Sequence, residues 1–305
     1  MIVLKPCVPK VRLDELAFSP DGAAIAAPAG HQGVMLWTAF TNGAKAQLLK
    51  PGVVCKRLAF SPDGKILYTG NDQLCAFDIA DDTGELIDIP KWAALWFGVS
   101  PDGSRLVVAE KPENTEDTRL TVWATDAFDA PIREVAFPSM VYSPPLFLPT
   151  GAQFILVEGE FKPSRQWEYR YVTRSLKTGV IVDQSEPLPD CPDQVVLLPD
   201  GRRLACRTRE VIRVYPTAGK WKDIPAITND SKKQFTGIAY HPSGKYVAAT
   251  SNDKTVKFYD TASWEVAKTY TWDVGRMRSV CFSPDGNLAA AGSDTGKVVV
   301  WDVDA

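Results

Sequence analysis

The sequence predicts an all-β fold, a seven-bladed β-propeller with four-stranded antiparallel blades, in which residues 1–305 form a single domain. The first observation is a Pro-x-Gly turn that follows a short apolar segment seven times, at spacings of 39 to 50 residues. The second is that β-prone segments fill each interval and no window shows a helical period. Sheets this small are marginal alone, so we expect the repeats to stack around a ring. The turn prolines are Pro20, Pro62, Pro101, Pro149, Pro199, Pro242 and Pro284.

The second repeat shows how each element is predicted. Arg57–Phe60 is an apolar strand, and Ser61–Gly64 supplies a tight turn in which proline presets φ and glycine tolerates the left-handed conformation. Lys65–Tyr68 is the hairpin partner of the first strand, Leu74–Phe77 is the third strand, and Glu85–Ile89 is the fourth. The same order in the other repeats predicts four strands per blade.

The last repeat resembles the WD-repeat family. It combines Ser279–Gly286, Gly292–Asp294 and an ending at Val298–Asp302 that contains the Trp-Asp pair. The sixth repeat is similar, and Trp37 and Trp123 end the third strands of the first and third repeats. The resemblance spans the whole chain and implies a scaffold for protein interactions. A TolB-like propeller, which shares the Ser-Pro-Asp-Gly turn but lacks the Trp-Asp ending, is the alternative.

Two departures from the WD pattern affect what holds the blades together. Tyr171 and Tyr215 replace the tryptophan in the fourth and fifth repeats. The family's hydrogen-bonded tetrad of Asp, His, Ser or Thr, and Trp lacks its histidine in every repeat, although Asp72, Asp253 and Asp294 match its aspartate. We therefore expect the tetrad to be missing and the blades to depend on apolar burial.

The resemblance also implies how the ring closes. The last repeat ends with a third strand at Trp301, and a spare β-prone segment, Met1–Leu4, precedes the first repeat. In WD-repeat proteins such a segment supplies the missing outer strand of the last blade. We expect Met1–Leu4 to do so here and to remove exposed blade faces.

Composition narrows the class of protein and of partner. The chain has 34 Lys and Arg against 37 Asp and Glu, a formal net charge of −3, which argues against nucleic acid as a partner. No apolar stretch approaches the length of a membrane span, and the first apolar run is too short for a secretory signal. The six cysteines are scattered without a C-x-x-C pair, which indicates free thiols. We expect a cytoplasmic protein, monomeric and without a membrane partner.

The sequence contains no recognisable catalytic, cofactor-binding or metal-binding set. Its two histidines are His31 and His241, and the common zinc, acyl-transfer and phosphate-binding motifs are absent. We therefore predict no enzyme and no cofactor, but a non-catalytic scaffold that binds a protein or peptide through the loop-rich face of the propeller. The alternative is a propeller enzyme, or a protein that binds a small ligand or metal at the mouth of the central channel, near His31.

Basic residues suggest one part of the binding surface. In WD-repeat propellers, partner contacts often come from residues six and eight positions before the turn proline. At these positions the basic residues fall in blades seven, one and two, which adjoin once the ring closes. We expect this sector to bind an acidic segment of a partner; unrelated solvated side chains are the alternative. The residues are Arg12, Lys56, Arg276 and Arg278.

Aromatic residues suggest a second part. The third and fourth repeats have long loops between their second and third strands and aromatic segments that lead into their first strands. Rigid aromatics beside polar loops are typical of interface hot spots, but they are also typical of blade packing, and the sequence does not decide between the two. The candidates are Trp92, Leu95, Tyr142, Phe161 and Trp167.

Overall fold

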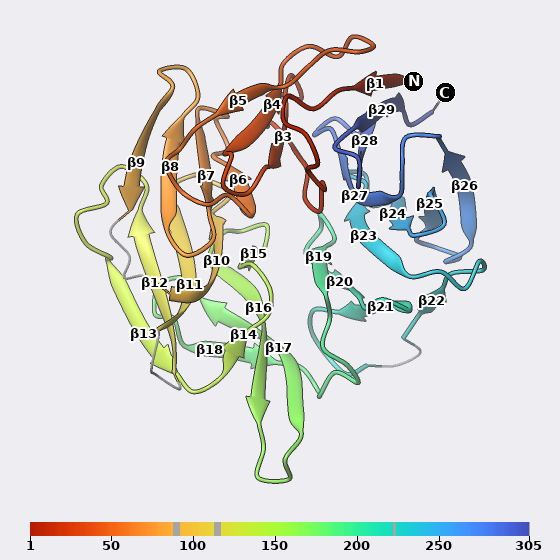
Figure 1. The fold of residues 1–305 in the computed structure, drawn as a ribbon. Coiled ribbons are helices and arrows are strands. Elements are labelled where there is room, and N and C mark those ends of the chain that lie inside the picture. Colours follow the sequence, from red (N-terminus) through yellow and green to blue (C-terminus); the bar gives the residue numbers. More distant parts are fainter. Residues whose placement is uncertain (88–91, 113–116, 222–223, 305) are drawn as a thin grey trace.

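The computed structural model describes residues 1–87, 92–112, 117–221 and 224–304, except for the side chains of residues 92–95 and 112. Seven antiparallel sheets follow one another around a ring, as Figure 1 shows, and the described residues contain strands and turns but no helix. Accordingly, no described helix is long and apolar enough to cross a membrane. The prediction of a seven-bladed, all-β propeller is confirmed.

Within each blade the strands run in chain order from the inside of the ring to its outside. The exception is the N-terminal strand, which is the outer strand of blade seven. Blade one contains β2 (Ala17–Phe18), β3 (Ile25–Pro28), β4 (Val34–Trp37) and β5 (Gln47–Leu49). Blade two contains β6 (Arg57–Phe60), β7 (Ile66–Gly70), β8 (Leu74–Asp78) and β9 (Thr83–Ile87). Blade three contains β10 (Trp92–Val99), β11 (Arg105–Pro112), β12 (Thr118–Ala124) and β13 (Arg133–Phe137). Thus the fourth strand of blade two begins two residues before its predicted start.

Blade four has an interrupted first strand. It contains β14 (Met140–Val141), β15 (Leu146–Phe147), β16 (Gln153–Phe161), β17 (Trp167–Ser175) and β18 (Ile181–Gln184). Blade five contains β19 (Gln194–Leu197), β20 (Arg203–Arg207), β21 (Val211–Pro216) and β22 (Ala226–Thr228). Blade six contains β23 (Phe235–Tyr240), β24 (Tyr246–Ser251), β25 (Thr255–Asp260) and β26 (Val266–Thr271). Blade seven contains β27 (Met277–Phe282), β28 (Leu288–Ser293), β29 (Val298–Asp302) and β1 (Ile2–Leu4).

The four Ser-Pro-Asp-Gly turns, in blades one, two, three and seven, share one hydrogen-bond pattern. In blade two, Ser61 Oγ donates to Asp63 Oδ1 at 2.6 Å and accepts from the backbone N–H of Ile66 at 2.9 Å. Gly64 has a φ of 74°, which a side chain would disfavour, and its N–H donates to the Ser61 carbonyl at 2.9 Å. The turn residues thus form a self-contained unit that fixes the first hairpin of the blade.

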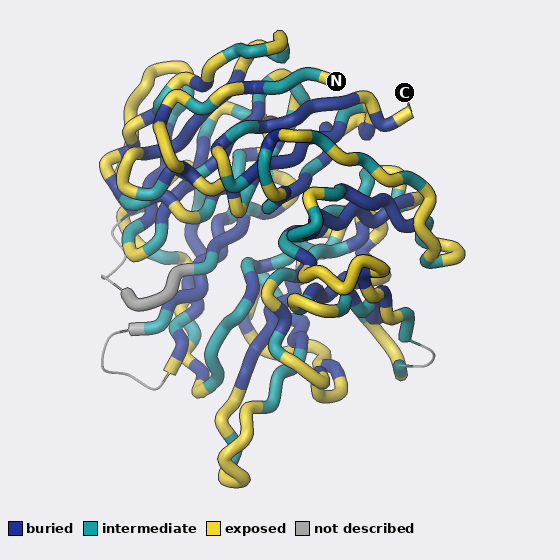
Figure 2. Tube along the Cα trace, turned by 45° about the vertical axis from the view of Figure 1, so that its right-hand side comes forward, coloured by how far each residue is buried: buried dark blue, intermediate teal, exposed yellow. Residues whose placement is uncertain are grey.

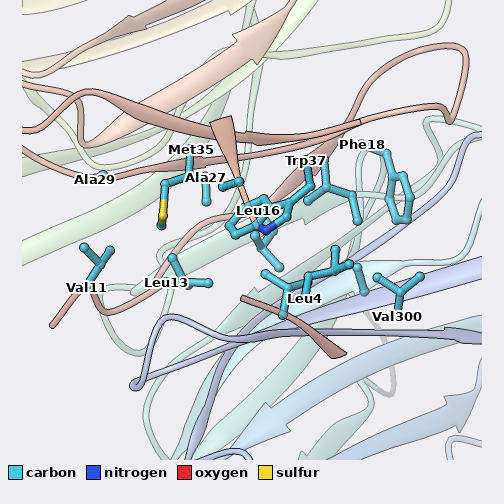
Figure 3. Packing of buried hydrophobic residues seen from close by; sticks show 14 of the residues in the cluster. Leu4, Val11, Leu13, Leu16, Phe18, Ala27, Ala29, Met35, Trp37 and Val300 are labelled. Carbon is cyan, nitrogen blue, oxygen red and sulfur yellow. The ribbon is translucent and has the colours of Figure 1, made fainter. Parts of the chain in front are cut away.

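The N-terminal strand closes the ring as predicted. β1 pairs antiparallel with β29, with Ile2 opposite Val300 and Leu4 opposite Val298. Leu4 is fully buried, and Figure 3 shows it beside Val300 and close to Trp37 of blade one. The indole Nε1 of Trp37 donates to the Lys5 carbonyl at 2.9 Å. One segment therefore joins blade seven to blade one through a strand ladder, a shared apolar core and a hydrogen bond.

Buried apolar clusters lie between the blades as expected, and a polar network in blade six adds to them. Asn229 Nδ2 donates to Ser251 Oγ at 2.7 Å and to Asp253 Oδ2 at 3.3 Å. Thr255 Oγ1 donates to the other oxygen of Asp253 at 2.6 Å. An asparagine amide thus supplies the donor expected from the family's histidine. In blade seven the matched aspartate, Asp294, instead accepts from the Arg276 backbone N–H at 3.0 Å.

The strand register also corrects the tryptophan position of blade four. In blades one, three and seven the tryptophan pairs with the fifth residue after the turn proline, as Trp37 does with Ile25. In blade four that residue is Phe154, and its partner is Arg174 rather than Tyr171. The prediction was wrong because the hairpin of β16 and β17 is longer than those of the other repeats, so that sequence spacing misplaced the third strand.

In blade four an ion pair between Arg174 and Glu158 takes the place of the tryptophan. The Arg174 side chain is 4% exposed, and its Nε lies 2.7 Å from Glu158 Oε1. The guanidinium carbon lies 3.9 Å from the centroid of the Phe137 ring in blade three, so the cation packs on the neighbouring blade. Ser139 Oγ donates to the second Glu158 oxygen at 2.6 Å. A buried, fully partnered ion pair therefore occupies this interface between blades.

We predict that Arg174→Ala destabilises the protein by about 3–5 kcal/mol, because it leaves the Glu158 carboxylate buried without its cation. Urea denaturation of Arg174→Ala, Glu158→Ala and the double variant measures the coupling. The double variant should lose clearly less than the sum of the two single losses. Additive losses would show that the two side chains do not stabilise each other.

Candidate functional site

The mouth of the central channel is a cavity of about 920 Å³. All seven blades contribute to its wall, and most of the lining residues lie at or just before the start of a first strand, as do Lys56 and Arg278. The first strands of neighbouring blades pack against each other around the ring axis. We call this cavity the channel mouth. It lies on the loop-rich face, opposite the Pro-x-Gly turns.

The channel mouth is strongly cationic. Seven cationic side chains and three carboxylates line it, which is an excess of four positive charges when every group is ionised. The chain as a whole carries a net charge of −3, so the mouth concentrates charge of the opposite sign. The cations are Arg12, Lys56, Arg57, Arg207, Arg209, Arg276 and Arg278, and the carboxylates are Asp14, Glu15 and Asp193.

Two of the carboxylates already have cationic partners. Arg12 Nε lies 2.6 Å from Asp14 Oδ2, and Arg207 Nη1 lies 3.3 Å from Asp193 Oδ2. These contacts leave much of the positive charge of the mouth without a counter-ion from the described part of the chain. Among the described residues, the cations of the mouth with no carboxylate oxygen within 4.0 Å include Lys56, Arg209, Arg276 and Arg278.

The third carboxylate, Glu15, lies in an environment that favours its neutral form. Burial raises the pKa of Glu15 from 4.5 to about 7, against the opposing effects of a hydrogen bond from the Leu58 backbone N–H, at 3.1 Å, and of the nearby Arg57 charge. Near neutral pH the carboxyl is therefore partly protonated. The positive excess of the mouth grows as the pH falls.

Two arginines of the mouth are incompletely hydrogen-bonded. Arg207 is 8% exposed; its Nη1 donates to the Phe235 carbonyl at 3.1 Å, and burial lowers its pKa. Arg278 Nη1 donates to Asn252 Oδ1 at 3.3 Å. The Nε of each guanidinium is enclosed and has no hydrogen-bond partner within the described part of the chain. Guanidinium groups in this state gain most from an added anion.

Aromatic rings adjoin the cations of the mouth. The guanidinium carbon of Arg57 lies 3.2 Å from the centroid of the Trp96 ring, and Trp96 Nε1 donates to the Val141 carbonyl at 3.1 Å. The stacked ring holds Arg57 in place while desolvation lowers the pKa of its guanidinium. Tyr142, the residue after Val141, also lines the mouth.

The hairpin of β16 and β17 extends beyond the ring from blade four (Figure 1). We call its outer part, residues 159–169, the arm. Phe161 and Trp167 lie directly opposite each other on the arm and are 56% and 41% exposed. Trp167 stacks on Tyr169 with ring centroids 6.2 Å apart, and Tyr142 packs edge-on against Tyr169 at 5.3 Å. The aromatic cluster therefore connects the arm to the channel mouth.

The structure places the nine candidate residues in three groups. Two, Phe161 and Trp167, are exposed on the arm, outside the channel mouth. Two, Trp92 and Leu95, belong to β10, and their side chains lie outside the described part of the structure. The remaining five line the channel mouth: Arg12, Lys56, Tyr142, Arg276 and Arg278.

Most residues that line the mouth were not among the sequence candidates, and these include three arginines and a tryptophan. The three arginines were not predicted because they do not stand six or eight residues before a turn proline, the positions taken from the family. They are Arg57, Arg207 and Arg209. Trp96, which was not singled out in the aromatic segment before the third repeat, is half-buried and lines the mouth. Arg207 ends the second strand of blade five and Arg209 lies in the loop after it, and only the ring geometry brings both into the mouth.

The alternative, a catalytic or metal site at the channel mouth near His31, finds no support, because His31 does not line the mouth. His31 lies apart from the channel mouth, in a separate cavity of about 570 Å³ with Leu48, Lys50 and Val53. His241 is held in its turn by Ser243 Oγ at 2.7 Å. Over the described residues, no group of three or more His, Cys, Asp or Glu side chains is placed to hold a metal ion.

Comparisons with known proteins agree with this architecture. Residues 226–260 and 265–302 match the family described as WD domain, G-beta repeat. The chain is 27% identical over 148 residues to the serine-threonine kinase receptor-associated protein of Bos taurus, a match that covers 48% of this chain and 39% of that protein. It is 28% identical over 111 residues to the telomerase Cajal body protein 1 of Mus musculus, covering 34% of this chain and 21% of that protein. The aligned regions thus span less than half of each relative.

A solved structure shows the same fold over the whole chain. The β-propeller domain of Cps50 (Swd1) from Myceliophteria thermophila superimposes with a TM-score of 0.72 and covers 97% of this chain and 98% of that one. Its sequence identity is 13%, so the likeness concerns the fold alone.

We predict that Glu15→Gln raises the melting temperature at pH 8 and has little effect at pH 5. The pKa of Glu15 in the folded protein, about 7, lies above its ordinary value of 4.5, so the folded state holds the proton more tightly. The contribution of this group to stability is therefore lost as pH rises from about 4.5 through 7. Glutamine keeps an acceptor for the Leu58 N–H. Thermal melts at both pH values check this, with Glu210→Gln at an exposed position as the control. An equal shift of the melting temperature of Glu15→Gln at pH 5 and pH 8 would contradict the prediction.

Proposed function

Because this chain carries WD repeats in a seven-bladed propeller, we propose that it is a non-catalytic scaffold that binds an acidic segment of a partner protein at the channel mouth. The observation that carries this proposal is the excess of four positive charges in a cavity of about 920 Å³. Arginine guanidiniums bind carboxylates through paired, charge-assisted hydrogen bonds, and several arginines of the mouth have no carboxylate partner among the described residues.

The form of the site favours an extended segment of protein over a compact ligand. Cations reach the mouth from blades one, two, five and seven, so one small anion would leave most of them without a partner. A segment with several acidic side chains can contact them in turn. The bovine relative is named for its association with a receptor, which supports a protein as the partner.

We also propose that the protein acts in the cytoplasm as a monomer. All six cysteines are free thiols, and Cys55, Cys75 and Cys206 are buried, a use of cysteine typical of reducing compartments. The ring is closed within one chain by the pairing of β1 with β29, so its blade interfaces need no second copy.

Charge reversal at the mouth tests the proposal. We predict that Arg276→Glu with Arg278→Glu weakens binding of a fluorescent hexaglutamate peptide at least tenfold, because it turns attraction into repulsion at close range. Fluorescence anisotropy at several salt concentrations measures the affinity. The dependence on salt should also become shallower in the variant.

A matched control separates the mouth from the overall charge. Arg133→Glu with Arg202→Glu makes the same change in net charge at exposed positions outside the mouth. This control should bind the peptide with an affinity close to that of the parent protein. Equal losses in both pairs, or no binding by the parent protein, would refute the proposal.

A further inference from the structure

We propose that the aromatic face of the arm is a second binding subsite, which takes an apolar or aromatic side chain next to the acidic stretch of the same partner segment. This inference rests on the proposed function and adds to it a specific form of ligand: acidic residues in the channel mouth, followed directly by a hydrophobic anchor. The argument depends on three features of the arm, namely its exposed rings, its rigidity and its connection to the mouth.

The arm presents its rings on one face. Residues directly opposite in an antiparallel hairpin share a face, and residues two apart return to it, so Phe161, Trp167, Gly159 and Tyr169 lie together. The ring centroids of Phe161 and Trp167 are 5.5 Å apart, and both residues are exposed. Figure 2 shows that exposed residues gather at the tip of this hairpin, beyond the buried blades. Such a cluster has the composition of an interface hot spot.

The aromatic face is fixed before any ligand binds. A Cβ added at Gly159 would lie 2.7 Å from the Tyr142 ring and 2.8 Å from the Tyr169 ring, so glycine is needed for these rings to approach. At the tip, Lys162 N–H donates to the Gln166 carbonyl at 2.9 Å and fixes the turn. A rigid aromatic surface loses little conformational entropy on binding, which increases the gain from each contact.

The arm and the mouth form one continuous surface. Tyr142 lines the channel mouth and also packs against Trp167, with ring centroids 6.2 Å apart. A partner segment that binds the arginines of the mouth and then runs over Tyr142 therefore reaches the aromatic rings of the arm. This continuity identifies the occupant of the aromatic face as the part of the ligand that adjoins its acidic stretch.

The charges of the arm favour a protein segment over single-stranded nucleic acid, which could also stack on rings beside arginines. Lys162 lies 2.6 Å from Glu160, and Arg170, next to the arm, lies 3.0 Å from Glu168, so these two cations are already paired. Arg165 is the one other cation of the arm. A polynucleotide carries a phosphate at every nucleotide and would need free cations along the arm. A peptide whose acidic residues end where its apolar residues begin matches the surface.

Three peptides test the subsite: hexaglutamate, hexaglutamate extended by Leu-Phe at its N-terminal end, and hexaglutamate extended by Leu-Phe at its C-terminal end. We expect one of the extended peptides to bind the parent protein at least about fivefold more tightly than hexaglutamate. Phe161→Ala with Trp167→Ala should remove this gain and leave the affinity for hexaglutamate unchanged. Val182→Ala, at a 52% exposed position on the outer strand of the same blade, is the matched control and should keep the gain.

The outcomes separate the inference from the function on which it rests. If hexaglutamate binds but neither extension adds affinity, or if the gain survives in the arm variant, the subsite is refuted and the acidic-segment function stands. If hexaglutamate does not bind at all, the proposed function fails, and with it the inference. If a twelve-residue oligodeoxythymidylate binds more tightly than the extended peptides and loses affinity in the arm variant, the surface belongs to nucleic acid and the inference is wrong. Thermal melts of both variants should match the parent protein, because the replaced side chains lie outside the blade cores.

Discussion

The pairing of β1 with β29 is the interaction on which the rest of the structure depends. A propeller blade is stable only between two neighbours, so a ring with one open interface would expose two apolar faces. Here Leu4 is fully buried at that interface, in one cluster with Val300 and Trp37. Leu13 extends the connection toward the channel, because its N–H donates to the Ser293 carbonyl at 3.1 Å and its carbonyl accepts from Ser279 Oγ at 2.7 Å.

Closure also creates the electrostatic character of the channel mouth. Leu13 lies between Arg12 and Asp14, and its bonds to blade seven hold this segment next to the strand that begins beside Arg276 and Arg278. As a result, seven cationic side chains from four blades line the same cavity, together with three carboxylates. Keeping so many like charges together costs stability, which the closed ring and its apolar interfaces offset. An acidic ligand would relieve this repulsion.

The sequence predicted the repeat architecture well because turn chemistry is local. In the four Ser-Pro-Asp-Gly turns the serine bonds to the aspartate and to the glycine N–H within a few residues, so the pattern is visible in the chain, as at Ser61–Gly64. Closure was predicted from the unpaired segment before the first repeat. The tryptophan position of blade four was missed because the length of the arm changes the register, which places Arg174 where Tyr171 was expected. The positions taken from the family identified Arg12, Lys56, Arg276 and Arg278, but Arg207 joins them only through the ring geometry.

The most direct test of this account is the affinity of a chain lacking residues 1–5 for hexaglutamate. The measurement is made at a temperature at which near-ultraviolet circular dichroism shows that the shortened chain is folded. The control is Met1→Ala, which changes an exposed residue of the same segment. If closure assembles the mouth, the shortened chain should bind markedly more weakly than Met1→Ala, because blades seven and one are no longer held together. Affinity equal to that of the control, in a folded chain without β1, would contradict the account.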